Sequence, residues 1–322
     1  MRDTDYAFCV ARIRANEKKM LSSAFIDKLI DCDTYNQAVT MLMEAGWIDA
    51  VGELSDYIRE QNNKLWMLLY ESVPDKKELN ALCVLNDFFN IKAAVKCLFS
   101  GETAEHYYIQ PTSLDLNELT DKLNKQSFDF FGEKVTGDAV KSAYELVCKT
   151  HNGQNAEILI DNAALTMLKQ FSLKYKNTSF SDICAFITDT SNIKTAFRCV
   201  NTRKNSDFIN SAISDCCRID RKRLIDAANS GIEALCEYLE ATDYTKGVQL
   251  YLESPLLFEK WCDSKVISFA RYSKYTAFGF DPVCAYYYAK LDEIKKVRTI
   301  LFAKQSGVSK EILKERVGKS YV

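Results

Sequence analysis

Apolar residues recur at every third or fourth position between residues 81 and 99, as in an α-helix with one apolar face. These positions are Ala81, Val84, Leu85, Phe88, Ile91, Val95 and Leu98. The polar residues Asn86, Asp87, Asn90 and Lys96 fall away from that stripe. The pattern predicts one amphipathic helix of about five turns.

Helix-start and helix-stop signals mark a second long helix near the end of the sequence. Asp281 followed by Pro282 predicts an N-cap and the first helical residue, and Gly307 predicts the end of the helix. Between them, apolar residues again recur at helical spacing. Ser254 followed by Pro255 repeats the same start signal before another apolar segment.

The composition also favours helices. Glycine and proline number only 11 and 4 among 322 residues, which disfavours collagen-like, low-complexity and turn-rich β folds. Hydrophobic residues make up 47% and charged residues 27%, as in an ordinary folded globular protein. Because no segment alternates cleanly between apolar and polar positions, we predict an all-α protein, and its length suggests two or three domains.

A short motif occurs three times at a nearly constant interval. Its copies are Asp87-x-x-Asn90-Ile91-Lys92, Asp189-x-x-Asn192-Ile193-Lys194 and the degraded Glu293-x-x-Lys296-Val297-Arg298. The acids of successive copies are 102 and 104 residues apart. Nine residues after the final base stand Gly101, Arg203 and Gly307, respectively. The spacing predicts three homologous helical domains, over residues 1–108, 109–207 and 208–322.

The repeated charges are the candidate structural residues of this sequence: Asp87, Lys92, Asp189, Lys194, Glu293 and Arg298. Acid and base are five residues apart, about 140° around a helix, so they cannot form an i,i+4 pair. One hypothesis is that the acid of one domain meets the base of another, or caps a neighbouring helix end, and so locks three bundles into one rigid body. The other is that they are solvated charges inherited from a duplicated ancestor.

Charge and hydropathy exclude several classes of function. The net charge is −2, so the field of the whole molecule does not attract nucleic acid. Residues 1–105 carry 12 basic and 17 acidic side chains, which suggests a surface suited to a basic partner. No segment approaches the ~20 apolar residues of a membrane span, and the first 19 residues lack the apolar core of a signal peptide. We therefore expect neither secretion nor membrane insertion.

The sequence offers no catalytic constellation. Its 12 cysteines include no CxxC pair and are expected to be reduced and mostly buried. The two histidines, His106 and His151, lie in polar segments that we interpret as exposed loops, and no GxSxG motif accompanies them. We predict no catalytic residue, no metal site and no cofactor.

The segment from Phe258 to Val322 carries motifs of a known family. They are Gly279-Phe280-Asp281-Pro282-Val283, Ala285-Tyr286, Ala289-Lys290, Glu293 to Arg298, and the closing Ile312, Arg316 and Tyr321-Val322. Tyr6-Ala7 and Ala11 to Arg14, with the two Asn-Ile-Lys copies, extend the likeness over nearly the whole chain. The sequence resembles the C subunit of bacterial and archaeal V/A-type rotary ATPases, the counterpart of the d subunit of the eukaryotic vacuolar ATPase. It departs from that family at Asp292-Glu293 and Lys296-Val297-Arg298, where charge is conserved.

This resemblance implies a non-catalytic rotor subunit. Three similar helical bundles would form a funnel with a central cavity, seated on the cytoplasmic side of the membrane proteolipid ring. The open end would receive central-stalk subunits D and F, and the acidic first third could receive a basic tip of that axle. Such a socket would transmit torque for proton or sodium transport or ATP synthesis, with no membrane span of its own. The alternative from the residues alone is a generic α-helical repeat scaffold that binds a peptide or partner helix.

Overall fold

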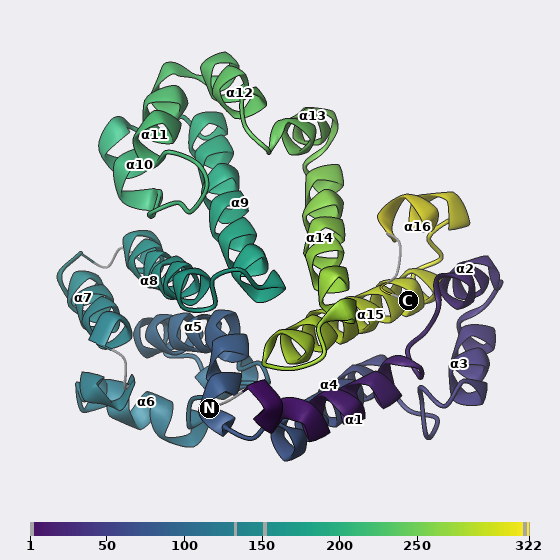
Figure 1. Ribbon diagram of the computed structural model, residues 1–322. Helices are drawn as coiled ribbons and strands as arrows, with labels where there is room; N and C mark the ends of the chain where they lie inside the picture. The colour runs from purple at the N-terminus through teal and green to yellow at the C-terminus, as the bar shows by residue number, and fades with distance from the viewer. Residues whose placement is uncertain (1–2, 132–133, 151–152, 318–320, 322) are drawn as a thin grey trace. The chain divides into compact units, whose positions relative to one another are not determined.

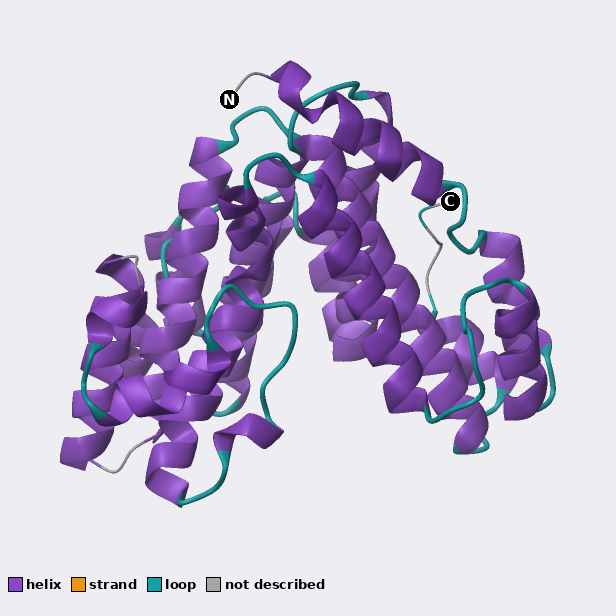
Figure 2. Cartoon of the chain, turned by 90° about the horizontal axis from the view of Figure 1, so that it is seen from below, coloured by secondary structure: helices purple, strands orange, loops and turns teal. Residues whose placement is uncertain are grey.

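The computed structural model of the chain describes residues 3–131, 134–150, 153–317 and 321. Within these ranges all regular secondary structure is helical and no strand occurs (Figure 2), which confirms the all-α prediction. No helix in the described ranges is both long and apolar enough to cross a membrane.

The chain divides into two compact units, each built from separate parts of the sequence. Unit 1 comprises Met1–Lys76, Asn177–Ile183 and Lys246–Val322, and unit 2 comprises Lys77–Lys176 and Cys184–Thr245. The beginning and the end of the chain thus fold together in unit 1. The boundaries of the three homologous domains stay a prediction.

Unit 1 contains the first and last helices of the chain, labelled in Figure 1. The N-terminal group is η1 (Asp3–Tyr6), α1 (Ala7–Glu17), α2 (Ser23–Asp31), α3 (Tyr35–Glu44) and α4 (Leu54–Ser72). The C-terminal group is α13 (Thr245–Glu253), α14 (Pro255–Tyr272), η4 (Ser273–Tyr275), α15 (Asp281–Gln305) and α16 (Lys310–Arg316). Helix α13 has its first residue in unit 2.

Unit 2 contains the middle helices. They are α5 (Lys76–Ser100), η2 (Ala104–His106), α6 (Leu116–Asn124), η3 (Phe128–Phe131), α7 (Lys134–Thr150), α8 (Gly153–Lys174), α9 (Ser179–Asn201), α10 (Ser206–Ala212), α11 (Arg221–Ser230) and α12 (Ile232–Glu240). The first residues of α5 and α9 belong to unit 1.

The core of unit 1 joins residues from both ends of the chain. Leu29, Leu42 and Trp47 from the N-terminal segment pack in one apolar cluster with Val297 and Leu301 of α15. Helix α15 lies beside α4 in Figure 1 and also contacts α1, α2 and α3. Because burial of apolar surface is the main favourable term in folding, the N-terminal helices depend on α15 for a complete core.

The predicted amphipathic helix over residues 81–99 is confirmed as part of α5, but its buried face differs from the prediction. Leu85 is 42% exposed, although it belongs to the apolar stripe. Asp87 and Asn90, which the pattern places off that stripe, are 8% and 0% exposed. They tolerate burial because a neighbouring loop supplies hydrogen-bond partners, as described below.

The predicted helix starts are confirmed at Ser254 and corrected at Asp281. Ser254 is the N-cap of α14, and its side chain accepts a hydrogen bond from the Leu256 N–H. In α15, by contrast, Phe280 is the N-cap and Asp281 is the first helical residue. The Asp281 carboxylate instead accepts hydrogen bonds from the Phe180 N–H at 2.9 Å and the Ser273 hydroxyl at 2.7 Å. It ties α15 to other segments of unit 1 rather than capping its own helix.

All three helices that carry the motif end in a left-handed residue. Gly101 follows α5 with φ +75°, and Gly307 follows Ser306 after α15 with φ +67°. Arg203 occupies the equivalent place after α9 with φ +51°, a conformation that side-chain-bearing residues seldom adopt. Its N–H donates to the Val200 carbonyl, as expected for a helix C-terminus. The repeat therefore extends to the helix ends, even where glycine is missing.

The predictions for the histidine and cysteine residues can be checked where the structure describes those residues. His106 closes the short helix η2 and is exposed, as expected, whereas His151 lies outside the described residues. Eight of the 12 cysteines are buried, and burial raises the pKa of the Cys9 thiol to about 11.

Candidate functional site

The three repeated acids are buried, whereas the repeated bases are not. Asp87, Asp189 and Glu293 are 8%, 0% and 4% exposed. Lys92 and Lys194 are half-buried, and Arg298 is exposed. The acids are therefore not solvated helix charges, and each must be stabilised by groups around it.

Asp87 on α5 holds the loop that precedes α6. One carboxylate oxygen accepts hydrogen bonds from the Ser113 N–H at 2.8 Å and from the Thr112 hydroxyl, and the other accepts from the Ser113 hydroxyl. One turn further along α5, the Asn90 amide bonds both the N–H and the carbonyl of Ile109, at 2.8 and 3.0 Å. Two motif positions thus fix one loop.

Asp189 on α9 holds the loop that precedes α11. Its carboxylate accepts hydrogen bonds from the N–H groups of Cys217 and Arg218, at 2.6 and 2.8 Å, and from the Tyr244 hydroxyl at 2.9 Å. Asn192 accepts a hydrogen bond from the Ser214 N–H at 2.9 Å. The second copy of the motif reproduces the arrangement of the first.

Glu293 on α15 holds a segment from the other end of the chain. One carboxylate oxygen accepts a hydrogen bond from the Leu21 N–H at 2.6 Å, just before α2. The other accepts from the Trp47 indole N–H at 2.9 Å and from the Lys290 ammonium. The contact spans 272 residues of sequence and ties α15 to the N-terminal segment.

We call each set of contacts around Asp87, Asp189 and Glu293 a carboxylate clasp. In every clasp, an acid from a long helix accepts a backbone N–H one or two residues before the N-cap of a shorter helix. The N-caps are Asp115 of α6, Asp220 of α11 and Ser22 of α2. The acids of the first two clasps bind segments that follow them in the sequence. The acid of the third clasp binds a segment near the beginning of the sequence.

Burial raises the pKa values of the two clasp acids in unit 2. Loss of hydration raises the pKa of Asp87 above its ordinary value, and the hydrogen bonds from Ser113 and Thr112 oppose that shift. Burial likewise raises the pKa of Asp189, against the bonds from Cys217, Arg218 and Tyr244. The donors recover only part of the free energy of hydration that each carboxylate loses.

The bases of the motif have separate roles. Lys92 forms an ion pair with Asp161 of α8 at 2.6 Å, within unit 2. Lys296, at the asparagine position of the third copy, is 6% exposed and pairs with Asp292 four residues earlier. A role of the repeated charges between domains stays a prediction.

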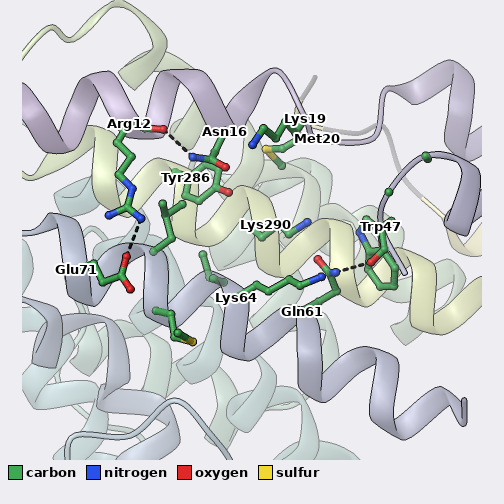
Figure 3. A pocket seen from close by; sticks show the side chains of 15 residues that line it. Arg12, Asn16, Lys19, Met20, Trp47, Gln61, Lys64, Glu71, Tyr286 and Lys290 are labelled. Atoms are coloured by element: carbon green, nitrogen blue, oxygen red, sulfur yellow. Dashed lines mark hydrogen bonds and ion pairs between the residues drawn. The ribbon is translucent and has the colours of Figure 1, made fainter. Parts of the chain in front are cut away.

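A hollow of about 650 Å³ lies in unit 1, beside the Glu293 clasp. Helix α4 lines it with residues on one face, because positions 61, 64, 65, 68 and 71 follow helical spacing. The other lining side chains in Figure 3 come from α1 (Arg12, Asn16), the segment after it (Lys19, Met20), Trp47, and α15 (Tyr286, Lys290). The sequence gives no sign of this hollow, because its walls come from segments that are far apart along the chain.

Ion pairs and hydrogen bonds fix the walls of the hollow. Arg12 pairs with Glu71 at 2.7 Å, and the Gln61 amide donates to the Trp47 carbonyl (Figure 3). Lys64 pairs with Asp49 and Glu60, at 2.7 and 2.6 Å. Partial burial is the largest single influence on the pKa of Lys64 and acts to lower it. The two acidic partners together outweigh burial, so the pKa of Lys64 is raised above its ordinary value. Lys64 is therefore charged at neutral pH.

The lining of the hollow is chemically mixed. It combines cations with the apolar side chains of Met20, Leu65 and Leu68. In the part of the chain that the structure describes, no group of three or more His, Cys, Asp or Glu side chains could hold a metal ion. Three of its four lining cations are ion-paired with acids: Arg12, Lys64 and Lys290.

Comparisons with known proteins agree along nearly the whole sequence. The chain is 23% identical to the C subunit of the V-type sodium ATPase of Enterococcus hirae over 320 residues, covering 96% of this chain and 97% of that protein. It is 24% identical to the C subunit of the A-type ATP synthase of Methanocaldococcus jannaschii over 339 residues, covering 95% of this chain and 84% of that protein. The family described as ATP synthase (C/AC39) subunit matches residues 9–316. The chain therefore belongs to the ATP synthase (C/AC39) subunit family.

Proposed function

We propose that this protein is a non-catalytic central-stalk subunit of a V/A-type rotary ATPase. It joins the axle of subunits D and F to the membrane proteolipid ring on the cytoplasmic face, and it transmits torque for proton or sodium transport or ATP synthesis. The observation that carries this proposal is the family match over residues 9–316, together with two relatives, both C subunits, aligned along almost the whole chain.

We also propose that the chain arose by triplication, with domains over residues 1–108, 109–207 and 208–322. The three clasps support this proposal, because each motif copy uses its acid on the segment that enters a helix. The left-handed residues at 101, 203 and 307 support it independently. A funnel arrangement of the three domains stays a prediction of the family resemblance.

Clasps suit a part that must carry torque. A buried carboxylate with three donors resists displacement of a loop more strongly than an exposed ion pair, which is worth about 0–1 kcal/mol. Without the clasps, the loops would move under the applied torque instead of transmitting it.

Co-purification tests the proposal. A tagged copy of the chain, expressed in its own cells and extracted in mild detergent, should bring down stalk subunits D and F and the proteolipid ring. The generic repeat scaffold predicts soluble partners only. Recovery of the chain without any ATPase subunit would contradict the rotor assignment.

A further inference from the structure

Tyr321, close to the end of the sequence, is buried among charged groups of unit 1 and is only 2% exposed. Its hydroxyl donates a hydrogen bond to Glu17 of α1 at 3.1 Å. Its carbonyl accepts hydrogen bonds from the Arg271 side chain at 3.3 Å and from the Lys274 ammonium at 3.1 Å. That ammonium also lies 4.5 Å from the centre of the Tyr321 ring, as in a cation–π contact. The hydroxyl, the ring and the backbone of this one residue are thus each held.

The phenol of Tyr321 keeps its proton. Burial raises the pKa of Tyr321 above its ordinary value of 10.0, and the charge of Glu17 raises that pKa further, against a smaller effect of Arg14. A protonated phenol is a donor, and a hydrogen bond to a carboxylate is stronger than a bond between neutral groups. Tyr321 therefore remains a donor to Glu17 at neutral pH.

Glu17 connects Tyr321 to Arg14, which also lies on α1. The Nη1 atom of Arg14 donates to both carboxylate oxygens of Glu17, at 2.8 and 2.9 Å. The Nη2 atom donates to the carbonyls of Ser273 and Thr276, at 2.6 and 3.1 Å. Because the guanidinium is planar and its N–H directions are fixed, the position of Glu17 decides whether Arg14 can reach both carbonyls. One chain of hydrogen bonds therefore runs from Tyr321 to the backbone at residues 273 and 276.

The backbone that Arg14 holds carries three exposed aromatic side chains. They are Tyr272, Tyr275 and Phe278, which are 68%, 92% and 48% exposed. Ser273 is 0% exposed, and its hydroxyl donates to the Asp281 carboxylate at 2.7 Å. We call residues 272–278 the aromatic segment. Its backbone is fixed on the protein side while its rings face solvent.

We propose that Tyr321 is a latch that fixes the conformation of the aromatic segment through Glu17 and Arg14. When Tyr321 leaves, Glu17 and Arg14 keep their own ion pair at 2.8 Å, but the pair loses the hydroxyl that restrains it and can turn away from the segment. Among the described residues, the apolar cluster of unit 1 does not include Tyr321, so the latch can open while that core stays packed. Opening is therefore a local event, which changes one exposed surface without unfolding the unit.

Limited digestion with chymotrypsin tests the latch. This protease cleaves after aromatic residues, and the cleavage rate follows the population of the locally opened chain. We expect cleavage in the aromatic segment to be about fivefold faster in Tyr321→Phe, which removes only the hydroxyl, and about tenfold or more faster in Tyr321→Ala. Arg14→Gln should also accelerate it. Adding Tyr321→Phe to Arg14→Gln should then change little, because both act on one chain of hydrogen bonds.

Tyr107→Phe is the matched control. The Tyr107 hydroxyl also donates to a carboxylate, that of Glu102 at 2.9 Å, but in unit 2. This change should leave cleavage in the aromatic segment within about twofold of wild type. Mass spectrometry of the fragments separates local opening from general loosening, because Phe8 and Phe302 of unit 1 are also exposed, at 69% and 62%.

Faster cleavage confined to the aromatic segment supports the latch. Unchanged cleavage in both Tyr321 variants would overturn it. A parallel rise in cleavage after Phe8 and Phe302 would mean that Tyr321 stabilises unit 1 as a whole, and would overturn the latch as well. Additive effects of Arg14→Gln and Tyr321→Phe would contradict the connection between the two residues. Circular dichroism verifies that each variant folds, and Tyr321→Phe, the mildest change, decides the question if Arg14→Gln does not fold.

Discussion

Replacing Asp189 with alanine should destabilise unit 2 by about 2–4 kcal/mol. The change leaves the N–H groups of Cys217 and Arg218 and the Tyr244 hydroxyl without their acceptor. A buried donor without an acceptor costs about 1–3 kcal/mol. Arg218 is exposed, so water reaches part of the site and the total for three donors is about 3–5 kcal/mol. Removing a carboxylate that is costly to bury offsets roughly 1 kcal/mol of this loss, which leaves the net destabilisation of about 2–4 kcal/mol.

Urea denaturation followed by far-UV circular dichroism measures the loss. Hydrogen exchange of residues 214–218 locates it, because release of the loop exposes those amides. Asp226→Ala is the matched control, an exposed aspartate on α11 whose removal should change stability by less than about 0.5 kcal/mol. If Asp189→Ala costs no more than this control, the clasp does not stabilise the fold.

The same carboxylate gives a pH dependence of known sign. The folded-state pKa of Asp189 is raised above its ordinary value of 3.8, chiefly by burial. Between the folded pKa and that value, the folded protein holds a proton that the unfolded chain lacks. The contribution of Asp189 to stability therefore grows as pH falls, by up to about 1.4 kcal/mol per pH unit. Asp189→Asn cannot titrate, so wild type should gain stability relative to it between pH 7 and pH 4.5. A relative loss would mean that the hydrogen bonds outweigh burial.

Three further substitutions test other features of the fold, each by denaturant unfolding. Arg203→Gly should raise stability by about 0.5–1 kcal/mol by relieving the left-handed backbone, whereas Arg198→Gly inside the preceding helix α9 should lower it by about 1 kcal/mol; equal effects would contradict this account. Ile300→Ala, in the shared core of unit 1, should cost about 2–5 kcal/mol and deprotect amides of α2 and α3; protection losses confined to α15 would disprove the shared core. Gly247→Ala should destabilise by about 1–3 kcal/mol, because its Cβ would lie 2.6 Å from the Trp261 ring; a gain of stability would show that the ring moves aside.

Local sequence signals predicted the helices and many of their ends. Periodicity alone indicated the helix over residues 81–99, and Ser254 and Gly307 marked real boundaries. These features depend on neighbouring residues, so a single sequence contains them. The repeat also pointed to positions with a shared structural role, although it did not show what that role is.

Features that depend on distant segments could not be predicted. Periodicity placed Asp87 and Asn90 off the apolar face, and only the loop at residues 109–113 explains their burial. Glu293 and Leu21 are 272 residues apart, and no spacing rule connects them. The hollow likewise could not be predicted from the sequence, because its walls meet only when α1, α4 and α15 have packed together.

The shared core of unit 1 has a consequence for synthesis of the chain on the ribosome. The segment through Lys76 emerges before Ile294, Val297 and Leu301, which complete its apolar cluster more than 200 residues later. At about 5–20 residues per second, this leaves the early helices with incompletely covered apolar surface for roughly 10–40 seconds. A chain truncated before α15 would keep that apolar surface uncovered, because it lacks the residues that complete the cluster.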